Sequence, residues 1–344
     1  MDAISATPGG VSARRLLIIF NPTAGLRRRR LLARTVAALA THGIAPVIRE
    51  TQARGDAERF AAAAAAEGFD AVVAAGGDGT INEVINGLVS HPGRCLPLGI
   101  VPLGTANVLA HELCLPRDPV ALAALLAGTP PRTIHVGRVN DRHFSMMVGV
   151  GLDALVVEHL KPRLKRWLGK GAYVIETAIQ LLRLRPVRYR VVIDGRVEEA
   201  AAVVVAKGHF YGGRFVCAPE ASLGDPLLHV CLFRGAGRLA ALRYTVGVVL
   251  GLIGRMPDYA IVKASRVRID AVAGGSIQAD GDTITHLPLD ISVAPRPLFV
   301  LAPAPQDAVT LPVVTTGDDR DRGPVGSRRY QPQPLAAGGR RRLG

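Results

Sequence analysis

The stretch VVAAGGDGTINEVINGL, residues 72–88, decides the fold of this chain. A run of β-branched and small apolar residues predicts a buried strand that ends at Ala75, and apolar residues at helical spacing follow the glycines. Between strand and helix lies the loop Gly76–Gly79, a geometry in which backbone N–H groups and a helix N-terminus hold phosphate. Asp78 places a carboxylate inside this loop. A bare anion-binding loop would avoid that charge, so Asp78 indicates catalysis or metal handling in addition to binding.

The helix after the loop has the signals of a defined start. Thr80 is at the N-cap position, and Glu83, three residues later, completes a T-x-x-E capping box. Asn82 and Glu83 lie on the first turn, beside the loop. The buried face of the helix is formed by residues at spacing i, i+3, i+4 and i+7, which are Ile81, Val84, Ile85 and Leu88.

The composition describes a basic protein with a large aliphatic core. The 344 residues are enough for two domains or one large one, and 49% of them are hydrophobic while only 4% are aromatic. A net charge of +14 favours a polyanionic partner, which is a nucleotide, an anionic membrane surface or a nucleic acid. The basic residues are scattered and the aromatic residues are few, so we do not expect nucleic-acid binding.

Lysine is absent from the part of the chain that carries the glycine loop, and first occurs at Lys161. That part therefore lacks both a Walker A lysine and the strand lysine of protein kinases. If it binds a nucleotide, backbone amides, arginine side chains and a metal ion must neutralise the phosphates.

The cysteines and the apolar segments indicate a cytoplasmic protein. The four cysteines are dispersed without CxxC spacing and are expected to be reduced thiols. No secretory signal is recognisable, and the longest apolar stretch of the C-terminal half, Tyr244–Ile253, is too short to span a bilayer. Any membrane contact is therefore expected to be peripheral, at the inner membrane face.

Two patterns divide the chain. Strands alternate with helices over residues 14–132, which predicts a doubly wound α/β lobe whose ligand site lies at the carboxyl ends of parallel strands. Short alternating strands over residues 133–296, interrupted by helical stretches at 160–182 and 239–252, predict a second, mainly β sandwich lobe. Residues 297–312 are candidates for a return to the first lobe. We expect residues 1–13 and the basic tail 313–344 to be disordered.

Two further strand ends carry turn and amide residues. NPTAG, residues 21–25, follows the first predicted strand, and VPLGTANVLA, residues 101–110, takes another strand through a glycine turn into a helix. Thr105 and Asn107 are expected to face outward there. Each loop alone is typical of an ordinary turn, but loops at the strand ends of one parallel sheet can line the same crevice.

Two acidic turns lie in the predicted β lobe. Asp225 precedes an apolar strand, and a carboxylate together with turn carbonyls suits a hard cation such as Mg²⁺, although an Asx turn would have the same sequence. In QADGD, residues 278–282, Asp280 and Asp282 flank a glycine in a hairpin-like turn. The second turn matters if Asp282 reaches the crevice beneath Asp78.

Taken together, these motifs resemble the diacylglycerol kinase catalytic-domain family, which includes bacterial lipid kinases and the sphingosine kinases. The order and spacing match over residues 14–303. GGDGT alone is shared with NAD kinases and phosphofructokinases, whereas its combination with PLGTANVLA is much more specific to the lipid kinases. The matching segments are NPTAG, GGDGTINEV, PLGTANVLA, GVGLDA (149–154), FYGGRFVCAPEASLGD (210–225) and QADGD.

The resemblance implies an ATP-dependent lipid kinase that uses Mg²⁺, with ATP bound by the 14–132 lobe and the lipid substrate bound by the 133–296 lobe. The catalytic residues would be Asp282, as the general base for the lipid hydroxyl, and Asp78, which would act at the phosphates. Asp225 and the backbone oxygens of Ser222 and Leu227 would hold a metal that orders the second lobe. By motif, the nucleotide contacts would be Asn21, Thr51, Gly76, Gly77, Asp78, Gly79, Thr80, Ile81, Asn82 and Thr105.

Two positions depart from the family pattern. Asp282 stands where the family usually has Glu, and its side chain is one methylene shorter, although a base needs only hydrogen-bond distance. Pro226 follows Asp225 where the family usually has Gly, and its fixed φ bears on the shape of the metal turn. Neither departure touches the glycine loop.

Two other functions fit parts of the sequence. One is a kinase of a soluble substrate, as the NAD kinases are, and the other is a non-catalytic protein that binds nucleotide or lipid, with Asp282 marking a decayed site. The basic segment 161–170, which includes Trp167, suits an anionic membrane interface and favours a lipid substrate. The sequence leaves open which lipid is phosphorylated, the oligomeric state and the role of the tail.

Overall fold

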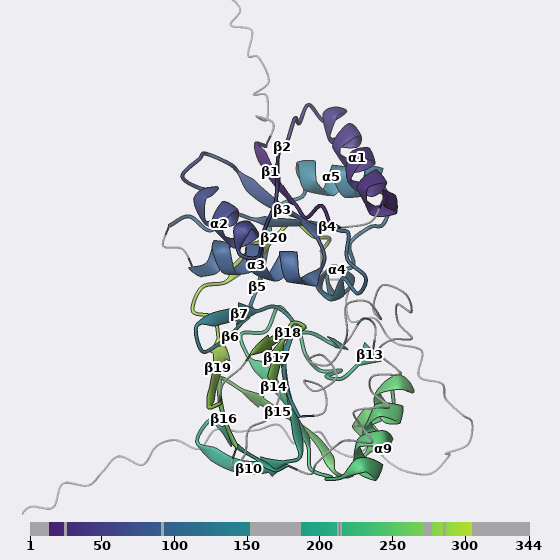
Figure 1. Ribbon diagram of the computed structural model, residues 1–344, viewed down its shortest axis with the longest axis vertical. Helices are drawn as coiled ribbons and strands as arrows, with labels where there is room; N and C mark the ends of the chain where they lie inside the picture. The colour runs from purple at the N-terminus through teal and green to yellow at the C-terminus, as the bar shows by residue number, and fades with distance from the viewer. Residues whose placement is uncertain are drawn as a thin grey trace, which may run out of the picture. The chain divides into compact units, whose positions relative to one another are not determined.

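The structure is a computed structural model that describes residues 14–23, 26–90, 93–151, 187–211, 213, 215–271, 277–284 and 287–304. Outside these residues lie the ends predicted to be disordered, the helix predicted at 160–182 with its basic segment 161–170, and residues 152–154 of GVGLDA. The described elements form an α/β lobe and a β lobe (Figure 1). In the described part of the chain, no helix is long and apolar enough to cross a membrane.

The α/β lobe is built on a six-stranded sheet with the order β2-β1-β3-β4-β20-β5. Neighbouring strands are parallel as far as β20, and β5 pairs with β20 as an antiparallel edge. β1 is apolar and buried along its whole length, which is typical of a parallel strand covered on both faces. The strands are β1 (Leu16–Phe20), β2 (Val47–Glu50), β3 (Ala71–Gly76), β4 (Leu98–Pro102), β5 (Arg132–Ile134) and β20 (Leu298–Val300).

Helices cover both faces of this sheet. Leu16 and Ile18 of β1 share a buried cluster with α1 (Leu26–Ala40) and α5 (Pro119–Gly128). Leu17 and Ile19 share another with α2 (Asp56–Ala63) and α3 (Asp78–Ser90). Successive strand residues point to opposite faces, so this alternation is the doubly wound arrangement that the sequence predicted. Figure 1 shows the α1/α5 pair and the α2/α3 pair on opposite sides of the strands.

The β lobe is a sandwich of two antiparallel six-stranded sheets, as the sequence predicted. One has the order β10-β9-β16-β19-β6-β7 and the other β15-β14-β11-β8-β17-β18. Apolar side chains of both sheets, among them Val191 and Ile269 of the first and Val148 and Val230 of the second, meet in one buried cluster. A hairpin of β12 (Phe210–Tyr211) and β13 (Phe215–Val216), the helix α9 (Arg238–Val249) and a 3₁₀ turn at Ile253–Arg255 accompany the sheets.

The strands of the first sandwich sheet are β6 (Gly137–Val139), β7 (Arg142–Phe144), β9 (Tyr189–Ile193), β10 (Arg196–Ala200), β16 (Arg266–Ala271) and β19 (Leu289–Val293). Those of the second are β8 (Met147–Val150), β11 (Ala202–Ala206), β14 (Leu228–Phe233), β15 (Tyr259–Ala264), β17 (Ile277–Ala279) and β18 (Asp282–Ile284).

The chain passes twice between the lobes. On the way out, the chain passes from β5, which lies in the α/β sheet, to β6, which lies in the β lobe. On the way back, β20 enters the first sheet between β4 and β5. The two passages are joined where the Ala294 N–H donates to the Val136 carbonyl at 2.9 Å.

Candidate active site

Four neighbouring parallel strands of the α/β sheet end at one edge. Phe20 at the end of β1 lies opposite Glu50 of β2 and Ala75 of β3, and Gly76 lies opposite Pro102 of β4. The loops that follow these strands, taken with the first two residues of α3 and here called the strand-end loops, carry six of the ten residues predicted to contact the nucleotide. In chain order those residues are Asn21, Thr51, Gly77, Asp78, Gly79 and Thr105. The topology therefore brings together residues that are more than 80 positions apart in the sequence.

The two glycine loops touch backbone to backbone. A Cβ added to Gly104 would lie 2.6 Å from the Gly77 Cα, and one added to Gly77 would lie 3.2 Å from the Gly104 Cα. The Leu103 N–H also donates to the Gly76 carbonyl at 2.8 Å. A side chain at either position would force the loops apart, so glycine is required here for close packing.

Asp78 fastens these loops together. Its carboxylate accepts hydrogen bonds from the Asn107 N–H at 2.9 Å and the Val108 N–H at 2.7 Å, at the start of α4 (Val108–Glu112). Burial raises the pKa of Asp78, the two N–H donors oppose that rise, and the nearby Asp280 carboxylate adds to it. Asp78 is thus a positioning residue for the second loop, a role that its place in a phosphate loop did not predict.

The predicted capping box is wrong. α3 begins at Asp78 rather than after Thr80, and the Ile81 N–H donates to the Gly77 carbonyl at 3.0 Å. The Thr80 hydroxyl accepts instead from the Asn21 amide at 3.2 Å. The Glu83 carboxylate accepts from the Ala57 N–H at 3.2 Å, in the first turn of α2. Long-range partners have replaced the local pair that the spacing suggested.

The second glycine loop, which contains Gly104 and is here called the companion loop, also differs from the prediction in one residue. Asn107 was expected to face outward, but its side chain turns back on its own loop. Its Oδ1 accepts from the Gly104 N–H at 2.7 Å and its Nδ2 donates to the Gly104 carbonyl at 3.0 Å. Thr105 is exposed, and so is Gly79 in the first loop, where an added Cβ would meet nothing within 4 Å. The accessible backbone of the two loops therefore lies at Gly79 and Thr105.

Asp280, between β17 and β18, is the acidic residue of the β lobe that contacts α3, beside the glycine loop. Its carboxylate accepts from the Ser145 N–H at 2.6 Å, the Ser145 hydroxyl at 2.9 Å, and the Met146 and Met147 N–H groups at 2.9 and 3.0 Å. It also accepts from the Asn82 amide of α3 at 3.0 Å. One carboxylate thus organises the β7–β8 turn and ties it to the α/β lobe.

A pair of asparagines on α3 forms a second tie between the lobes. The amides of Asn82 and Asn86 both donate to the His143 carbonyl of β7 at 3.1 Å, and the His143 N–H donates to the Asn86 Oδ1 at 2.9 Å. Asn86 was not among the residues predicted from the sequence, although its spacing of four from Asn82, on a face otherwise apolar, was a signal. Burial first, and then Arg138 and Arg142, lower the pKa of His143 to about 4.

Asp282 lies at the start of β18, two residues after Asp280, which is in the turn between β17 and β18. Its side chain is 46% exposed and pairs with the Arg54 guanidinium at 3.1 Å. Arg54 belongs to the loop after β2, which also contains Thr51. Asp282 therefore faces the strand-end loops with an accessible carboxylate, whereas its neighbour Asp280 is committed to structural hydrogen bonds.

A buried glutamate, paired with a partly exposed histidine, holds the other end of α4. Glu112, whose side chain is 4% exposed, accepts from the His209 N–H at 3.1 Å and pairs with the His209 ring Nδ1 at 2.6 Å. This hydrogen bond is the largest cause that raises the pKa of His209. With Asp78 at its start and Glu112 at its end, α4 is fixed to both the glycine loop and the β lobe.

In the turn predicted to hold a metal, a lysine side chain contacts the backbone oxygens. Lys207 Nζ donates to the backbone oxygens of Asp225 at 2.5 Å and Leu227 at 2.9 Å, and the Ser222 oxygen accepts from the Asp225 N–H at 3.2 Å. Two of the expected ligands, the backbone oxygens of Ser222 and Leu227, therefore already accept hydrogen bonds, and so does the backbone oxygen of Asp225. Across the described residues, no group of three or more acidic, histidine or cysteine side chains is arranged to bind a metal ion.

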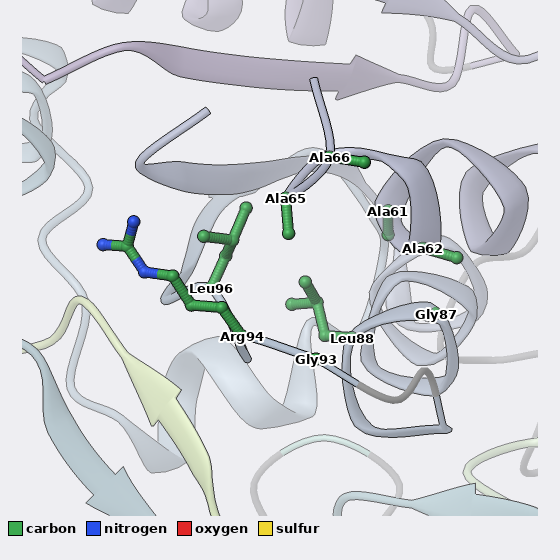
Figure 2. A pocket seen from close by; sticks show the side chains of 9 residues that line it. All are labelled: Ala61, Ala62, Ala65, Ala66, Gly87, Leu88, Gly93, Arg94 and Leu96. Atoms are coloured by element: carbon green, nitrogen blue, oxygen red, sulfur yellow. The ribbon is translucent and has the colours of Figure 1, made fainter. Parts of the chain in front are cut away.

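A hollow of about 290 Å³ between α2 and α3 is not part of this site. Figure 2 shows it lined by small and aliphatic side chains, with Arg94 at its side. The other lining residues are Ala61, Ala62, Ala65, Ala66, Gly87, Leu88, Gly93 and Leu96. Arg94 is the one ionisable side chain among them, so the hollow offers neither a base nor an acid.

Comparisons with known proteins agree with this architecture. The family model described as the diacylglycerol kinase catalytic domain matches residues 15–139, and that described as the YegS C-terminal NAD kinase beta sandwich-like domain matches residues 146–302. A diacylglycerol kinase of Mycobacterium tuberculosis is 33% identical over 258 residues, which are 72% of this chain and 82% of the relative.

Two further similarities extend over more of the chain. A diacylglycerol kinase of Bacillus subtilis is 30% identical over 294 residues, or 84% of this chain and 97% of the relative. The crystal structure of a diacylglycerol kinase from Bacillus anthracis is similar in fold, with a TM-score of 0.64 at 23% identity, over 85% of this chain and 98% of that one.

Proposed function

Because the chain belongs to the diacylglycerol kinase catalytic-domain family and is an ATP-dependent lipid kinase, we propose that the strand-end loops bind ATP and that Asp282 activates the lipid hydroxyl. Family membership favours a lipid kinase over the two other functions that the sequence left open, which were a kinase of a soluble substrate and a non-catalytic binding protein. The lobe of residues 14–132 would bind the nucleotide and that of residues 133–296 the lipid.

The observation that most supports the proposal is that the QADGD turn of the β lobe contacts both α3, just after the GGDGT loop, and the loop after β2. The Asn82 amide donates to Asp280 at 3.0 Å, and Arg54 pairs with Asp282 at 3.1 Å. These two contacts join a candidate base to the edge of the sheet where ligands of doubly wound folds bind.

The nucleotide phosphates would be held by backbone rather than by lysine. Gly79 lies in the first turn of α3, where N–H groups are free of intrahelical acceptors and the helix dipole favours an anion. Gly76, Gly77 and Thr80 would fix this loop, while Asn21, Thr51, Ile81, Asn82 and Thr105 would complete the nucleotide contacts. Mg²⁺ carried by the nucleotide would supply the positive charge that the lysine-free lobe lacks.

The reaction would be an in-line transfer. Asp282 would accept the proton of the lipid hydroxyl as its oxygen attacks the γ-phosphorus, and the bond from that phosphorus to the β–γ bridging oxygen would break to release ADP. Asp78 would act by holding the companion loop in place, since its oxygens accept from Asn107 and Val108. With diacylglycerol as the acceptor, the product would be phosphatidic acid, which places the enzyme in phospholipid metabolism.

The direct test incubates purified protein and labelled ATP with diacylglycerol, a sphingoid base or ceramide in mixed micelles. We expect labelled phosphatidic acid from the wild type, and a loss of at least about 100-fold in Asp78→Ala, because the two loops separate. A protein that labels no lipid would contradict the proposed reaction. An Asp78→Ala variant of unchanged activity would contradict the assigned site.

We further propose that α9 brings the enzyme to an anionic membrane, at its cytoplasmic face. Large apolar side chains recur along one side of this helix and just beyond it, and the most exposed of them, Leu239, is 84% exposed. Arg238 and Arg255, both exposed, flank them. A lipid surface is the partner that suits this face, since the substrate is a lipid and the chain carries +14 net charge. The other exposed apolar residues are Leu242, Val246, Val249, Leu250 and Leu252.

Co-sedimentation with vesicles of anionic or zwitterionic lipid tests this surface. The double variant Leu239→Glu, Val246→Glu is expected to lose binding to anionic vesicles. The matched control Val197→Glu replaces an exposed valine of β10, which is 54% exposed, and is expected to bind as the wild type does. Equal binding by the double variant and the wild type would show that α9 is not the membrane surface.

A further inference from the structure

Lys207 is the most deeply buried charged side chain that the described residues contain. It follows β11, its exposed fraction is 0%, and its N–H donates to the Met146 carbonyl at 2.8 Å. Its side chain runs to the 222–227 turn, where Nζ donates to the carbonyl oxygens of Asp225 at 2.5 Å and Leu227 at 2.9 Å. A buried ammonium is costly without such acceptors, so these two bonds are the reason that it is tolerated.

The groups around this ammonium are mainly basic or neutral. The Asp225 carboxylate, 45% exposed, lies 4.0 Å from Lys263 Nζ on β15. His135 holds the turn from the other side, its N–H donating to the Leu223 carbonyl at 2.7 Å. Burial lowers the pKa of both His135 and the fully buried His229, and the positive charge of Lys207 lowers both further. Glu220 is the other acid that acts on His229.

We propose that the ammonium of Lys207 is the resident cation of the 222–227 turn and takes the place of a divalent metal, so that the β lobe is ordered without Mg²⁺. A cation such as Mg²⁺ needs oxygen ligands at about 2.0–2.1 Å and near-octahedral geometry. Bound to the backbone oxygens of Asp225 and Leu227, it would have to share them with an ammonium at hydrogen-bond distance, and like charges that close repel strongly. The proposal does not depend on the phosphoryl transfer proposed above.

The first test uses nucleotide-free protein, so that metal bound with ATP does not enter. The melting temperature of the wild type is measured with excess EDTA and with MgCl₂, and Mg²⁺ binding is followed by calorimetry. We expect the same melting temperature in both and no saturable heat of binding. A wild type that Mg²⁺ stabilises, through a binding site that Asp225→Asn removes, would overturn the proposal.

A matched pair of lysine variants provides the second test. Lys207→Ala removes the buried cation and is expected to lower the melting temperature in EDTA by roughly 5 °C or more, because two buried carbonyls lose their donor. Mg²⁺ or Ca²⁺ should then restore part of that loss. Lys263→Ala, which removes the exposed lysine beside the same carboxylate, should show neither effect. If Lys207→Ala melts as the wild type does, the proposal is wrong; if it does not fold at all, the wild-type measurement decides.

Discussion

Each lobe contributes an acidic turn to the candidate site, and the two turns are built in different ways. In the GGDGT loop, Asp78 accepts from backbone N–H groups of the neighbouring strand-end loop, and glycines bring the two loops into contact. In the QADGD turn, the two aspartates divide the work: Asp280 accepts five hydrogen bonds, while Asp282 meets one arginine at the surface. The part of the site around the GGDGT loop is thus formed mainly by backbone contacts and strand order. The part around the QADGD turn depends on which partner each aspartate side chain binds.

The largest effect should come from separating the two aspartates of the QADGD turn. Asp280→Ala leaves three backbone N–H groups, a hydroxyl and the Asn82 amide without their acceptor, and we expect a loss of about 4 kcal/mol in the free energy of unfolding. Asp282→Ala breaks a half-exposed ion pair and should cost at most about 1 kcal/mol. Urea denaturation of both variants measures the difference. Equal losses would contradict the conclusion that Asp280 is structural and Asp282 is not.

The junction of the lobes should also respond to pH through His143. Its folded-state pKa is lowered from the ordinary value of 6.5 to about 4, so the unfolded chain takes up a proton first as the pH falls. The stabilising effect of the neutral ring is present above pH 6.5 and is lost as the pH drops towards 4. It amounts to about 3 kcal/mol.

The measurement is the free energy of unfolding between pH 7 and pH 4, roughly the range that the two pKa values bracket. In His143→Gln the part of the slope due to this histidine should disappear, while the slopes from other groups remain. A variant with the same pH dependence as the wild type would show that His143 is not the group that titrates.

Two glycines of the GGDGT segment, Gly76 and Gly79, should respond differently to replacement by alanine. In Gly76→Ala the new Cβ would lie 2.5 Å from the Thr80 side chain, and we expect a loss of about 2 kcal/mol in the free energy of unfolding. In Gly79→Ala the Cβ meets nothing within 4 Å, so stability should be kept or rise slightly.

Activity should separate the same pair. The added methyl of Gly79→Ala projects where we place the phosphates, so KM for ATP should rise about tenfold, as expected from a lost charge-assisted hydrogen bond. Thermal melting and steady-state kinetics on both variants measure the two effects. A Gly79→Ala enzyme with an unchanged KM would remove that residue from the nucleotide site.

The same difference explains how much the sequence could predict. Residues 72–88 indicated a strand, a loop and a helix, and the parallel topology then brought Asn21, Gly76 and Thr105 to one edge without knowledge of side-chain partners. The capping box failed because Asn21 and Ala57 bind the two side chains that it needed. Local spacing carries no information about such partners.

The β lobe was harder to predict for a related reason. Asn82 and Asp280 are 198 positions apart, and nothing near either residue in the sequence marks the pairing. Lys207 is similar, because a lysine after an apolar strand is usually solvated, whereas here it reaches two carbonyls 18 and 20 residues further on. The sandwich itself was predictable from alternating short strands, but the roles of its polar residues were not.

The role proposed for Asp282 is to take the proton from the lipid hydroxyl. The measurement is phosphoryl transfer from ATP to diacylglycerol by Asp282→Asn and Asp282→Glu, with melting temperature and ATP affinity recorded for each. We expect a fall of at least about 100-fold in kcat for Asp282→Asn, with fold and ATP affinity unchanged, and substantial activity in Asp282→Glu. An Asp282→Asn enzyme that turns over at the wild-type rate would contradict it.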